Sequence, residues 1–228
     1  LEEELLRNER LVTLGRMVAH VTHEIKNPLA VIGGFARQCE RQQELSEENR
    51  RKVQLIHQEV QRLGKFLADL ASFTHTAPTQ KVPGDIVALI KEVAEFMEGD
   101  FREKGITFVP QAPGEIPGFP FDPGQMRQVL LNLWKNSLEA MPRGGVITVS
   151  AAVRGDYLEL SIQDTGLGIP PDHLKSLFTP FFSTKEGGTG LGLTICRGLI
   201  DQHQGQIEFV SEVDRGTTCT IRLPLAAA

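Results

Sequence analysis

The uneven distribution of glycine and proline is the feature that most constrains the fold of this 228-residue chain. Residues 1–80 contain only four of the 22 glycines and two of the 13 prolines. Because both residues interrupt regular elements, we expect the first part to be helical and the rest to be a mixed α/β domain rich in turns. Residues 77–84 form a short polar stretch with two prolines. They are predicted to be a linker between domains at residues 1–76 and 85–228.

Apolar residues in the first part recur at alternating spacings of three and four. One run is Leu11, Leu14, Val18, Val21 and Ile25, and the other is Val53, Ile56, Val60, Leu63, Leu67 and Leu70. This spacing is typical of helices that pack in coiled coils. Two helices alone cannot enclose a core. We therefore expect an antiparallel helical hairpin that pairs with a second copy in a dimeric four-helix bundle.

The second part alternates helical and strand-like patterns. Helices are predicted over residues 85–104, 122–140 and 191–204, and strands over 106–109, 146–153 and 157–163, with a final hairpin over 206–223. On the first of these helices, Phe96 and Met97 are expected on the apolar side together with Ile86, Leu89, Ile90 and Val93. The pattern predicts a mostly antiparallel sheet with helices on one face, an α/β sandwich.

Charge and composition exclude several classes of protein. The net charge is -5 and the chain has no basic run, which argues against nucleic-acid binding. Its apolar stretches are too short to span a bilayer, so no direct membrane contact is expected. Three widely spaced cysteines, Cys39, Cys196 and Cys219, fit neither a zinc site nor a disulfide framework. We expect inert thiols in a reducing, cytoplasmic setting.

His23 is the first candidate for chemistry, because the helical register turns it away from the apolar seam. An exposed histidine with an ordinary pKa near ~6.5 is substantially neutral at pH 7 and can act as a nucleophile. Glu24 is adjacent and could orient the ring or accept its proton, and Asn27 lies one turn further along the same face. Two alternatives stay open at this point: an inert surface histidine, and a metal pair with His20.

Two glycine clusters in the second part indicate a phosphate-bearing ligand. The sequence 164–168, Asp-Thr-Gly-Leu-Gly, follows a predicted strand, and its carboxylate could accept a hydrogen bond from an exocyclic amine. Glycines at 187, 188, 190 and 192 precede a predicted helix, whose exposed amides suit phosphate. A Rossmann fingerprint is rejected, because the spacing is not met and no core strand precedes it. A simple strand-to-loop turn remains the alternative for the first cluster.

Asn132 and Asn136 lie four residues apart on one face of a predicted helix. Amide oxygens can ligate Mg²⁺, which also takes water and phosphate oxygens. The alternative is a pair of ordinary surface amides.

Taken together, these segments resemble the sensor histidine kinases of two-component systems. His-Glu-Ile-Lys-Asn-Pro-Leu at residues 23–29 is similar to their H-box. Residues 132–136, 164–168, 178–182 and 188–192 resemble, in order, the N-, G1-, F- and G2-boxes of the ATP-binding Bergerat fold. The triplet Gly216-Thr-Thr218 matches the usual closing motif. Residues 136–141 together with Phe-Phe-Ser-Thr-Lys at 181–185 look like the nitrogen-regulation-like subgroup of the family.

The resemblance implies a role for each matching residue. His23 would be the autophosphorylated residue, Glu24 its acid/base helper, and Asn27 a residue that positions water for dephosphorylation of the partner. Asn136 would coordinate Mg²⁺, Asp164 would bind the adenine amine, and Lys185 would reach the terminal phosphate. The full set expected to bind ATP is Asn132, Asn136, Asp164, Gly166, Gly168, Lys185, Gly188, Gly190, Leu191, Gly192 and Thr217.

The implied function is an ATP-dependent protein-histidine kinase that works as a homodimer. It would pass the phosphoryl group to an aspartate in the receiver domain of a response regulator, and would also remove phosphate from that regulator. A dimeric scaffold that binds ATP without catalysis is the alternative. An ATP-hydrolysing switch is disfavoured, because Asn132 stands where such relatives carry a glutamate base. Two departures from the family pattern are Ser137, where Ala is common, and Glu139, where many relatives carry Lys.

Overall fold

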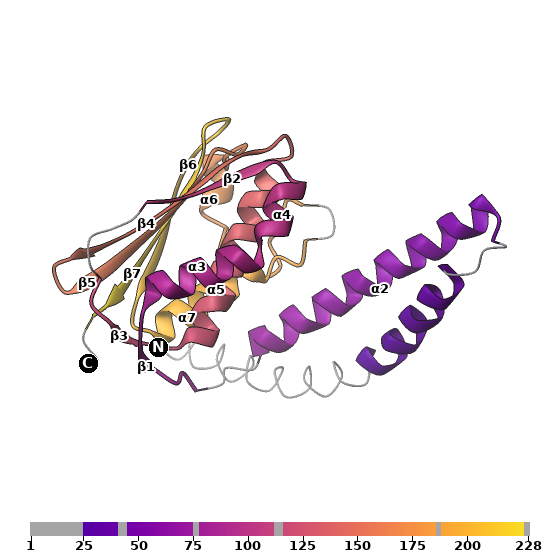
Figure 1. Ribbon diagram of the computed structural model, residues 1–228, viewed down its shortest axis with the longest axis horizontal. Coiled ribbons are helices and arrows are strands. Elements are labelled where there is room, and N and C mark those ends of the chain that lie inside the picture. Colours follow the sequence, from indigo (N-terminus) through magenta and orange to yellow (C-terminus); the bar gives the residue numbers. More distant parts are fainter. Residues whose placement is uncertain (1–24, 41–44, 75–77, 112–115, 186–187, 226–228) are drawn as a thin grey trace. The chain divides into compact units, whose positions relative to one another are not determined.

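The computed structural model describes residues 25–40, 45–74, 78–111, 116–185 and 188–225. The chain divides into two compact units. The first comprises Leu1–Ala77 and Ser183–Leu191, and the second comprises Pro78–Phe182 and Gly192–Ala228. Helices make up most of the described part of the first unit, and the second contains a sheet with its covering helices (Figure 1).

The first unit contains a helical hairpin, as predicted. One helix covers residues 25–40, and the second is α2 (Glu47–Thr74). Ser46 caps α2, because its hydroxyl oxygen accepts a hydrogen bond from the Asn49 backbone amide at 3.3 Å. Glu47 and Glu48 then place negative charge in the first turn, where the helix dipole favours it. The predicted apolar positions before residue 25 lie outside the described residues.

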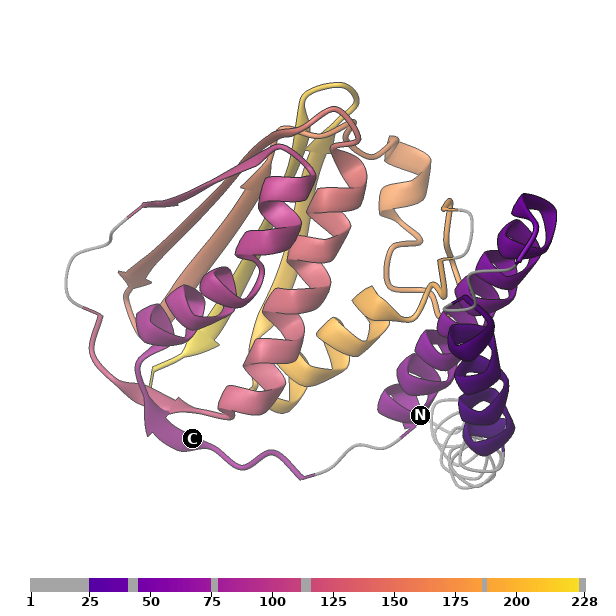
Figure 2. The ribbon, with the colours of Figure 1, turned by 45° about the vertical axis from the view of Figure 1, so that its right-hand side comes forward.

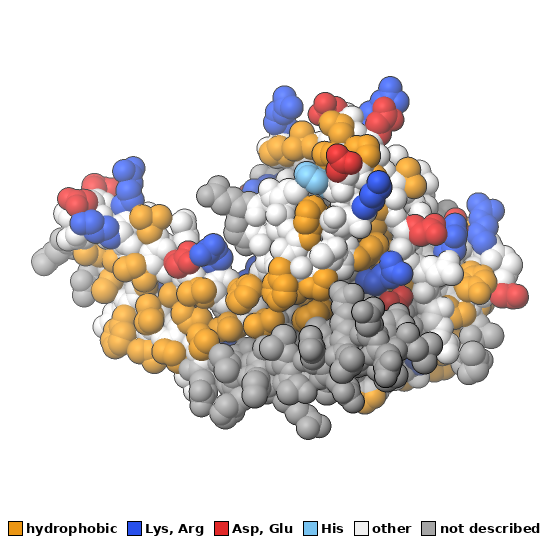
Figure 3. All heavy atoms as spheres, turned by 180° about the vertical axis from the view of Figure 1, so that it is seen from behind, with side chains coloured by type: hydrophobic (Ala, Val, Ile, Leu, Met, Phe, Trp, Pro, Cys, Tyr) orange, Lys and Arg blue, Asp and Glu red, His pale blue; other side chains and the backbone are white. Residues whose placement is uncertain are grey.

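The hairpin buries a few apolar side chains and leaves many exposed. Leu29, Ala36 and Leu67 are buried. The helices approach closely at Gly33, where an added Cβ would lie 3.0 Å from Cγ1 of Val60. The large apolar side chains that stay exposed on the hairpin are Ile25, Val31, Ile32, Phe35, Leu55, Ile56 and Leu63. Figure 3 shows hydrophobic side chains gathered along this hairpin, a surface that a partner helix pair would cover.

The second unit is built on a five-stranded sheet. Its strands are β2 (Ile106–Gln111), β4 (Gly145–Arg154), β5 (Tyr157–Asp164), β6 (Gln206–Glu212) and β7 (Gly216–Pro224). They lie in the order β2-β4-β5-β7-β6. Only β2 and β4 are parallel among these neighbours, and the other pairs are antiparallel. The mostly antiparallel sheet predicted from the sequence is therefore confirmed.

Helices cover one face of this sheet, as Figure 2 shows. They are α3 (Ile86–Phe96), α4 (Glu98–Glu103), α5 (Pro123–Ala140) and α7 (Gly192–Gln202), and a short α6 (Pro171–Leu174) lies in the connection after β5. Asp122 caps α5, since its carboxylate accepts the backbone N–H groups of Gly124 and Gln125, both at 3.0 Å. The Asp-Pro start predicted for this helix is confirmed.

The prediction of one helix over residues 85–104 is wrong. The structure breaks it at Met97, whose φ of -93° and ψ of 4° are not helical, so α3 and α4 are separate helices. Met97, at this break, and Phe101, after it, lie in the core, with exposed fractions of 0% and 5%. Phe96 is 75% exposed, which corrects the expectation that Phe96 lies on the apolar side.

A small second sheet was not predicted. β1 (Val82–Gly84) pairs antiparallel with β3 (Phe119–Phe121). The Phe121 ring lies against Gly84, where an added Cβ would come within 2.8 Å of the ring. Part of the segment predicted as a linker thus belongs to a strand of the second unit. The domain limits themselves stay a prediction.

The core lies between the sheet and its helices. Phe101, Phe108 and Trp134 form an aromatic group, with the Phe108 and Trp134 rings in an edge contact at 5.0 Å between centroids. Trp134 is fully buried, as expected for a core residue of its helix. This packing fixes α5 against β2 and so positions the opposite face of α5 for the site.

Candidate functional site

Asp164 is a buried carboxylate of the second unit that is held by three hydrogen bonds. It ends β5 and is only 6% exposed. Oδ1 accepts the backbone N–H groups of Gly166 at 3.0 Å and Thr217 at 3.2 Å. Oδ2 accepts the hydroxyl proton of Ser137 at 3.0 Å. Since a buried carboxylate needs such partners, the surrounding chain is built to hold this acceptor in one orientation.

The loop after Asp164 is fastened to the β6–β7 turn. Ser211 Oγ accepts the Ile169 backbone amide at 2.8 Å and donates to the Gly216 carbonyl oxygen at 2.9 Å. Gly168 has a φ of +68°, and a Cβ there would lie 2.1 Å from the carbonyl oxygen of Glu212. Only glycine fits at this position, both for its backbone angle and for the close approach of the turn.

Gly216 makes the second close approach at this end of the sheet. Its φ is +105°, and an added Cβ would lie 2.0 Å from the carbonyl oxygen of Asp164. Thr217 is the register partner of Asp164 across β5 and β7. The predicted site residues Asp164, Gly166, Gly168 and Thr217 are therefore brought together by the structure.

Helix α5 carries the asparagines beside this carboxylate. Ser137, which contacts Asp164 directly, follows Asn136 in the chain. Asn136 and Asn132 are each partly buried, and Asn132 Nδ2 donates to the carbonyl oxygen of Gly192 at 3.4 Å. Asn132 thereby links α5 to the first residue of α7. Ser137 thus places this part of α5 beside Asp164, and the roles of Asn132 and Asn136 stay a prediction.

The first turn of α7 is attached to the Phe-rich segment that precedes it. Thr194 donates to the carbonyl oxygen of Phe178 at 3.3 Å. The guanidinium carbon of Arg197 lies 5.0 Å from the Phe178 ring centroid, and Phe209 packs edge-on against the same ring at 5.7 Å. These contacts hold the first turn of α7, which begins at Gly192, and the first backbone amides of a helix have no partner within the helix itself.

The remaining glycine-rich residues fall in the first unit. Lys185, Gly188, Gly190 and Leu191 belong to it, whereas Gly192 belongs to the second unit. Lys185 donates its backbone N–H to Ser183 Oγ at 3.1 Å, and Gly190 has a φ of +66°. Their predicted contact with phosphate stays a prediction.

The phosphoacceptor candidates lie at the edge of what the structure describes. His23 and Glu24 lie outside the described residues, as does His20. Asn27 is described, and it is exposed on the helix of residues 25–40. The outward-facing polar patch of His23, Glu24 and Asn27 stays a prediction.

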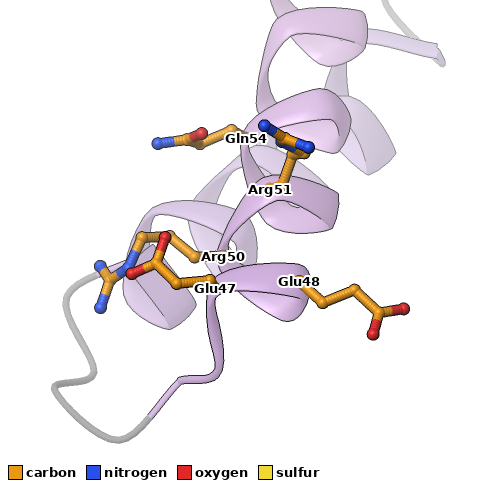
Figure 4. A pocket seen from close by; sticks show the side chains of 5 residues that line it. All are labelled: Glu47, Glu48, Arg50, Arg51 and Gln54. Atoms are coloured by element: carbon orange, nitrogen blue, oxygen red, sulfur yellow. The ribbon is translucent and has the colours of Figure 1, made fainter.

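One hollow of about 480 Å³ lies at the start of α2. It is lined by Glu47, Glu48, Arg50, Arg51 and Gln54. Figure 4 shows that these side chains project from different sides of the helix and do not converge on a point. The hollow contains none of the predicted site residues. Among the described residues, no group of three or more His, Cys, Asp or Glu side chains is placed to hold a metal ion.

Two buried cysteines and one histidine of the second unit have shifted pKa values. Burial raises the pKa of the Cys196 thiol to about 12, and burial also raises the pKa of Cys219. Both are therefore protonated and unreactive near neutral pH, as expected. Burial, with the positive charge of Lys81, lowers the pKa of His203 below its ordinary value. Its Nε2 accepts the Asp122 backbone amide at 3.0 Å, which requires the neutral ring.

Comparison with known proteins decides the family. Residues 13–75 match the His Kinase A (phospho-acceptor) domain. Residues 121–227 match the histidine kinase-, DNA gyrase B- and HSP90-like ATPase family. The chain belongs to the histidine kinases. The two matches follow the same order as the predicted hairpin and sheet domain, so the recognition made from the motifs is confirmed. The nitrogen-regulation-like subgroup stays a prediction.

Relatives and solved structures agree with this family. The sensor histidine kinase ZraS of Escherichia coli (strain K12) is 34% identical over 99% of the chain and 48% of its own length. The chain therefore spans about half the length of the curated relatives it matches. The structure of full-length ShkA in complex with AMPPNP is 30% identical over 93% of the chain and 46% of its own, with a TM-score of 0.78. The structure of histidine kinase ThkA in complex with response regulator protein TrrA is 30% identical over 98% of the chain and 65% of its own, with a TM-score of 0.71.

Sequence reasoning did not identify two parts of this site. Ser137 was noted only as a departure from the family pattern, yet it makes a direct hydrogen bond to Asp164. Ser211 was not singled out at all, although it joins the loop at Ile169 to the Gly216 turn. A serine on an outer strand gives no sequence signal of its own. Its role depends on the loop that the fold brings next to it.

No helix in the described part of the chain is both long and apolar enough to cross a membrane.

Proposed function

We propose that this chain is the catalytic portion of a protein-histidine kinase that phosphorylates its own His23 with ATP. The observation that carries the proposal is the Asp164 carboxylate, held by three hydrogen bonds at the end of β5 in a member of the histidine kinase family. A fixed, buried acceptor of this kind suits an exocyclic amine, and adenine has one. The ShkA structure holds AMPPNP, an ATP analogue, which supports the same ligand class here.

The phosphates are assigned to the N-terminus of α7 and the glycine-rich residues before it. Backbone N–H groups at a helix start carry partial positive charge and bind anions. Gly192 begins α7, and Gly188 and Gly190 precede it. Lys185 is proposed to reach the terminal phosphate as a point charge.

Asn136 fits the donor chemistry of a magnesium site completed by phosphates and water. Its amide oxygen is a hard ligand, and its neighbour Ser137 contacts Asp164, so Asn136 lies beside the proposed base pocket. Mg²⁺ bound in this way neutralises phosphate charge during transfer.

Transfer to a protein side chain is favoured over hydrolysis. Asn132 occupies the position where a glutamate would activate water, and an amide cannot take that proton. Its Nδ2 instead donates to Gly192 and helps hold the start of α7. We infer that Asn132 positions the helix and that His23 is the nucleophile. The imidazole nitrogen of His23 forms a bond to the γ-phosphorus of ATP while the bond from that phosphorus to ADP breaks. Glu24 takes the proton that the imidazole ring loses.

The partners follow from the family and from the hairpin surface. The exposed Val31, Phe35 and Leu55 side chains need a second hairpin to cover them, which supports a homodimer. A response regulator is bound in the ThkA–TrrA complex. By this likeness we propose that an aspartate in a receiver domain accepts the phosphoryl group, and that Asn27 positions the water for its later removal.

The proposal is tested with γ-labelled ATP and Mg²⁺ on the chain itself and on Asn136→Ala. Wild type is expected to acquire label that is labile in acid and stable in base, as a phosphoramidate is. Asn136→Ala is expected to be labelled at least ten times more slowly than wild type. Gln128→Ala, which removes a partly buried amide on the same helix, is expected to be labelled at the rate of wild type. Unlabelled wild type that still binds ATP would favour the scaffold, and release of free phosphate without protein label would favour a hydrolase.

A further inference from the structure

Ser137 supplies one of the three hydrogen bonds that hold Asp164, and the proposed function gives this serine no part in choosing the base. It lies on α5 and is only 5% exposed. Its hydroxyl donates to Oδ2 of Asp164 at 3.0 Å, the carboxylate oxygen opposite the one held by the backbone. An alanine at this position would leave that oxygen without this partner.

The hydroxyl protons around Asp164 are all committed. Ser137 has a single O–H, and Asp164 accepts it. Ser211 donates its single proton to the Gly216 carbonyl oxygen. In the 2.9 Å contact between Ser211 Oγ and Thr217 Oγ1 either atom could donate, and Thr217 is the donor when the Ser211 proton points at the Gly216 carbonyl oxygen. In that arrangement Ser137 and Thr217 have only lone pairs left to offer a ligand.

The carboxylate itself is restricted in the same way. Its Oδ1 accepts two backbone amides, from Gly166 and Thr217, which use both of its lone pairs. Its Oδ2 keeps one lone pair after accepting from Ser137. Because both oxygens are held from different sides, the group cannot turn to present another face. Every free position on these side chains is an acceptor.

A surface that offers only hydrogen-bond acceptors favours a nucleobase whose edge carries donors. An exocyclic amine brings two N–H donors, so it can meet both the free lone pair of Asp164 Oδ2 and that of Ser137 Oγ. A carbonyl in the same place would face the lone pair of Asp164 Oδ2, and Ser137 could donate to it only by turning its hydroxyl away from Asp164, which would cost the carboxylate that hydrogen bond.

We propose that Ser137 is a specificity-determining residue that makes the site favour 6-aminopurine over 6-oxopurine nucleotides. It fixes the Asp164 carboxylate and supplies a second acceptor beside it. This inference rests on the proposed function, in which Asp164 meets the purine ring.

The test compares three nucleotides that differ at the purine 6-position. ATP carries an amine, inosine triphosphate carries a carbonyl, and purine riboside triphosphate carries only hydrogen. Dissociation constants are measured by titration calorimetry with Mg²⁺ for wild type, Ser137→Ala and Ser137→Cys. Cysteine keeps the volume of the side chain but is a weak donor, so it separates packing from hydrogen bonding. Ser161→Ala is the matched control, since Ser161 lies on the opposite face of β5 from Asp164.

Both variants are expected to weaken ATP binding by about three- to tenfold, the range for one lost hydrogen bond. Binding of the other two nucleotides is expected to change less than twofold, so the preference for ATP over inosine triphosphate narrows. Ser161→Ala is expected to match wild type.

Two results would overturn the inference. A preference for ATP that is unchanged in both variants would remove Ser137 from base selection, and an equal loss for all three nucleotides would reduce its role to packing. Wild type that binds none of the three would overturn the proposed function as well. That result is distinct from the first two, in which wild type binds ATP normally.

Discussion

Replacement of Asp164 by Asn tests the assignment of the nucleotide base most sharply. The substitution keeps the size of the side chain and exchanges one carboxylate oxygen for an amide NH₂ group. The amide oxygen can still accept the N–H groups of Gly166 and Thr217. The NH₂ group replaces Oδ2, and Ser137 can accept from it by rotating its hydroxyl. The fold is therefore expected to survive while the acceptor for the base is lost.

The size of the binding defect follows from the bond that is removed. A hydrogen bond to a charged acceptor contributes about 1.5–3 kcal/mol, and 1.4 kcal/mol corresponds to a factor of ten. The substituted amide also sets a donor against the donor of the adenine amine. We expect Asp164→Asn to weaken ATP binding by about 10- to 150-fold.

Titration calorimetry with ATP and Mg²⁺ measures this change directly. Thermal unfolding without nucleotide serves as the check on the fold and is expected to shift by only a few degrees. Asp156→Asn, an exposed aspartate in the turn before β5, is the matched control and should bind ATP like wild type. Affinity within twofold of wild type for Asp164→Asn, in a folded protein, would refute the reasoning.

Three further predictions concern the fold and the dimer. Because burial lowers the pKa of His203, the unfolded chain takes up its proton first as the pH falls below about 6.5. The free energy of unfolding should therefore fall as the pH is lowered from about 7 to 5. In urea titrations, His203→Asn should show a weaker dependence of that free energy on pH than wild type, and an equal dependence in both proteins would contradict the prediction. Gly168→Ala should lower the free energy of unfolding by about 2 kcal/mol or more, because the backbone there has a positive φ and the added Cβ would lie 2.1 Å from the carbonyl oxygen of Glu212. Gly99→Ala, with open space around it, should unfold at the same temperature as wild type. Phe35→Asp on the hairpin should give monomers in light scattering, while Phe96→Asp on the second unit should stay dimeric, although Phe96 is 75% exposed and Phe35 64%; a dimeric Phe35→Asp would remove this face from the interface.

Much of the fold could be predicted because local signals and tertiary packing agree. Asp122 and Pro123 mark the start of α5, and Ser46 with its acidic neighbours marks the start of α2. The turn at residues 154–156 separates two strands with clear alternation, and the structure places β4 and β5 around it. At these places the residues nearest in sequence decide the geometry.

The errors lie where packing overrides the local pattern. Residues 86–103 carry one continuous helical pattern, but the backbone leaves the helical conformation at Met97, and Phe96 is 75% exposed. The strand at Val82–Gly84 is short and contains Pro83, so only its pairing with β3 defines it. Parallel pairing of β2 with β4 likewise depends on contacts distant in sequence.

The site divides in the same way. Motif residues such as Asp164 and Gly168 were singled out by their spacing and given roles through the family resemblance, and the structure shows what holds each in place. Ser137 and Ser211 could not be given a role in this way, since each acts through a partner that the fold supplies from another element.

The most direct test of the whole account is where the phosphoryl group goes. Wild type, His23→Gln and His20→Gln are incubated with γ-labelled ATP and Mg²⁺, and acid-labile, base-stable label on the protein is counted. His20→Gln is the matched control, a histidine one turn away on the same predicted helix. We predict label on wild type and His20→Gln and none on His23→Gln, with ATP binding intact in all three. Label that persists on His23→Gln would contradict the account.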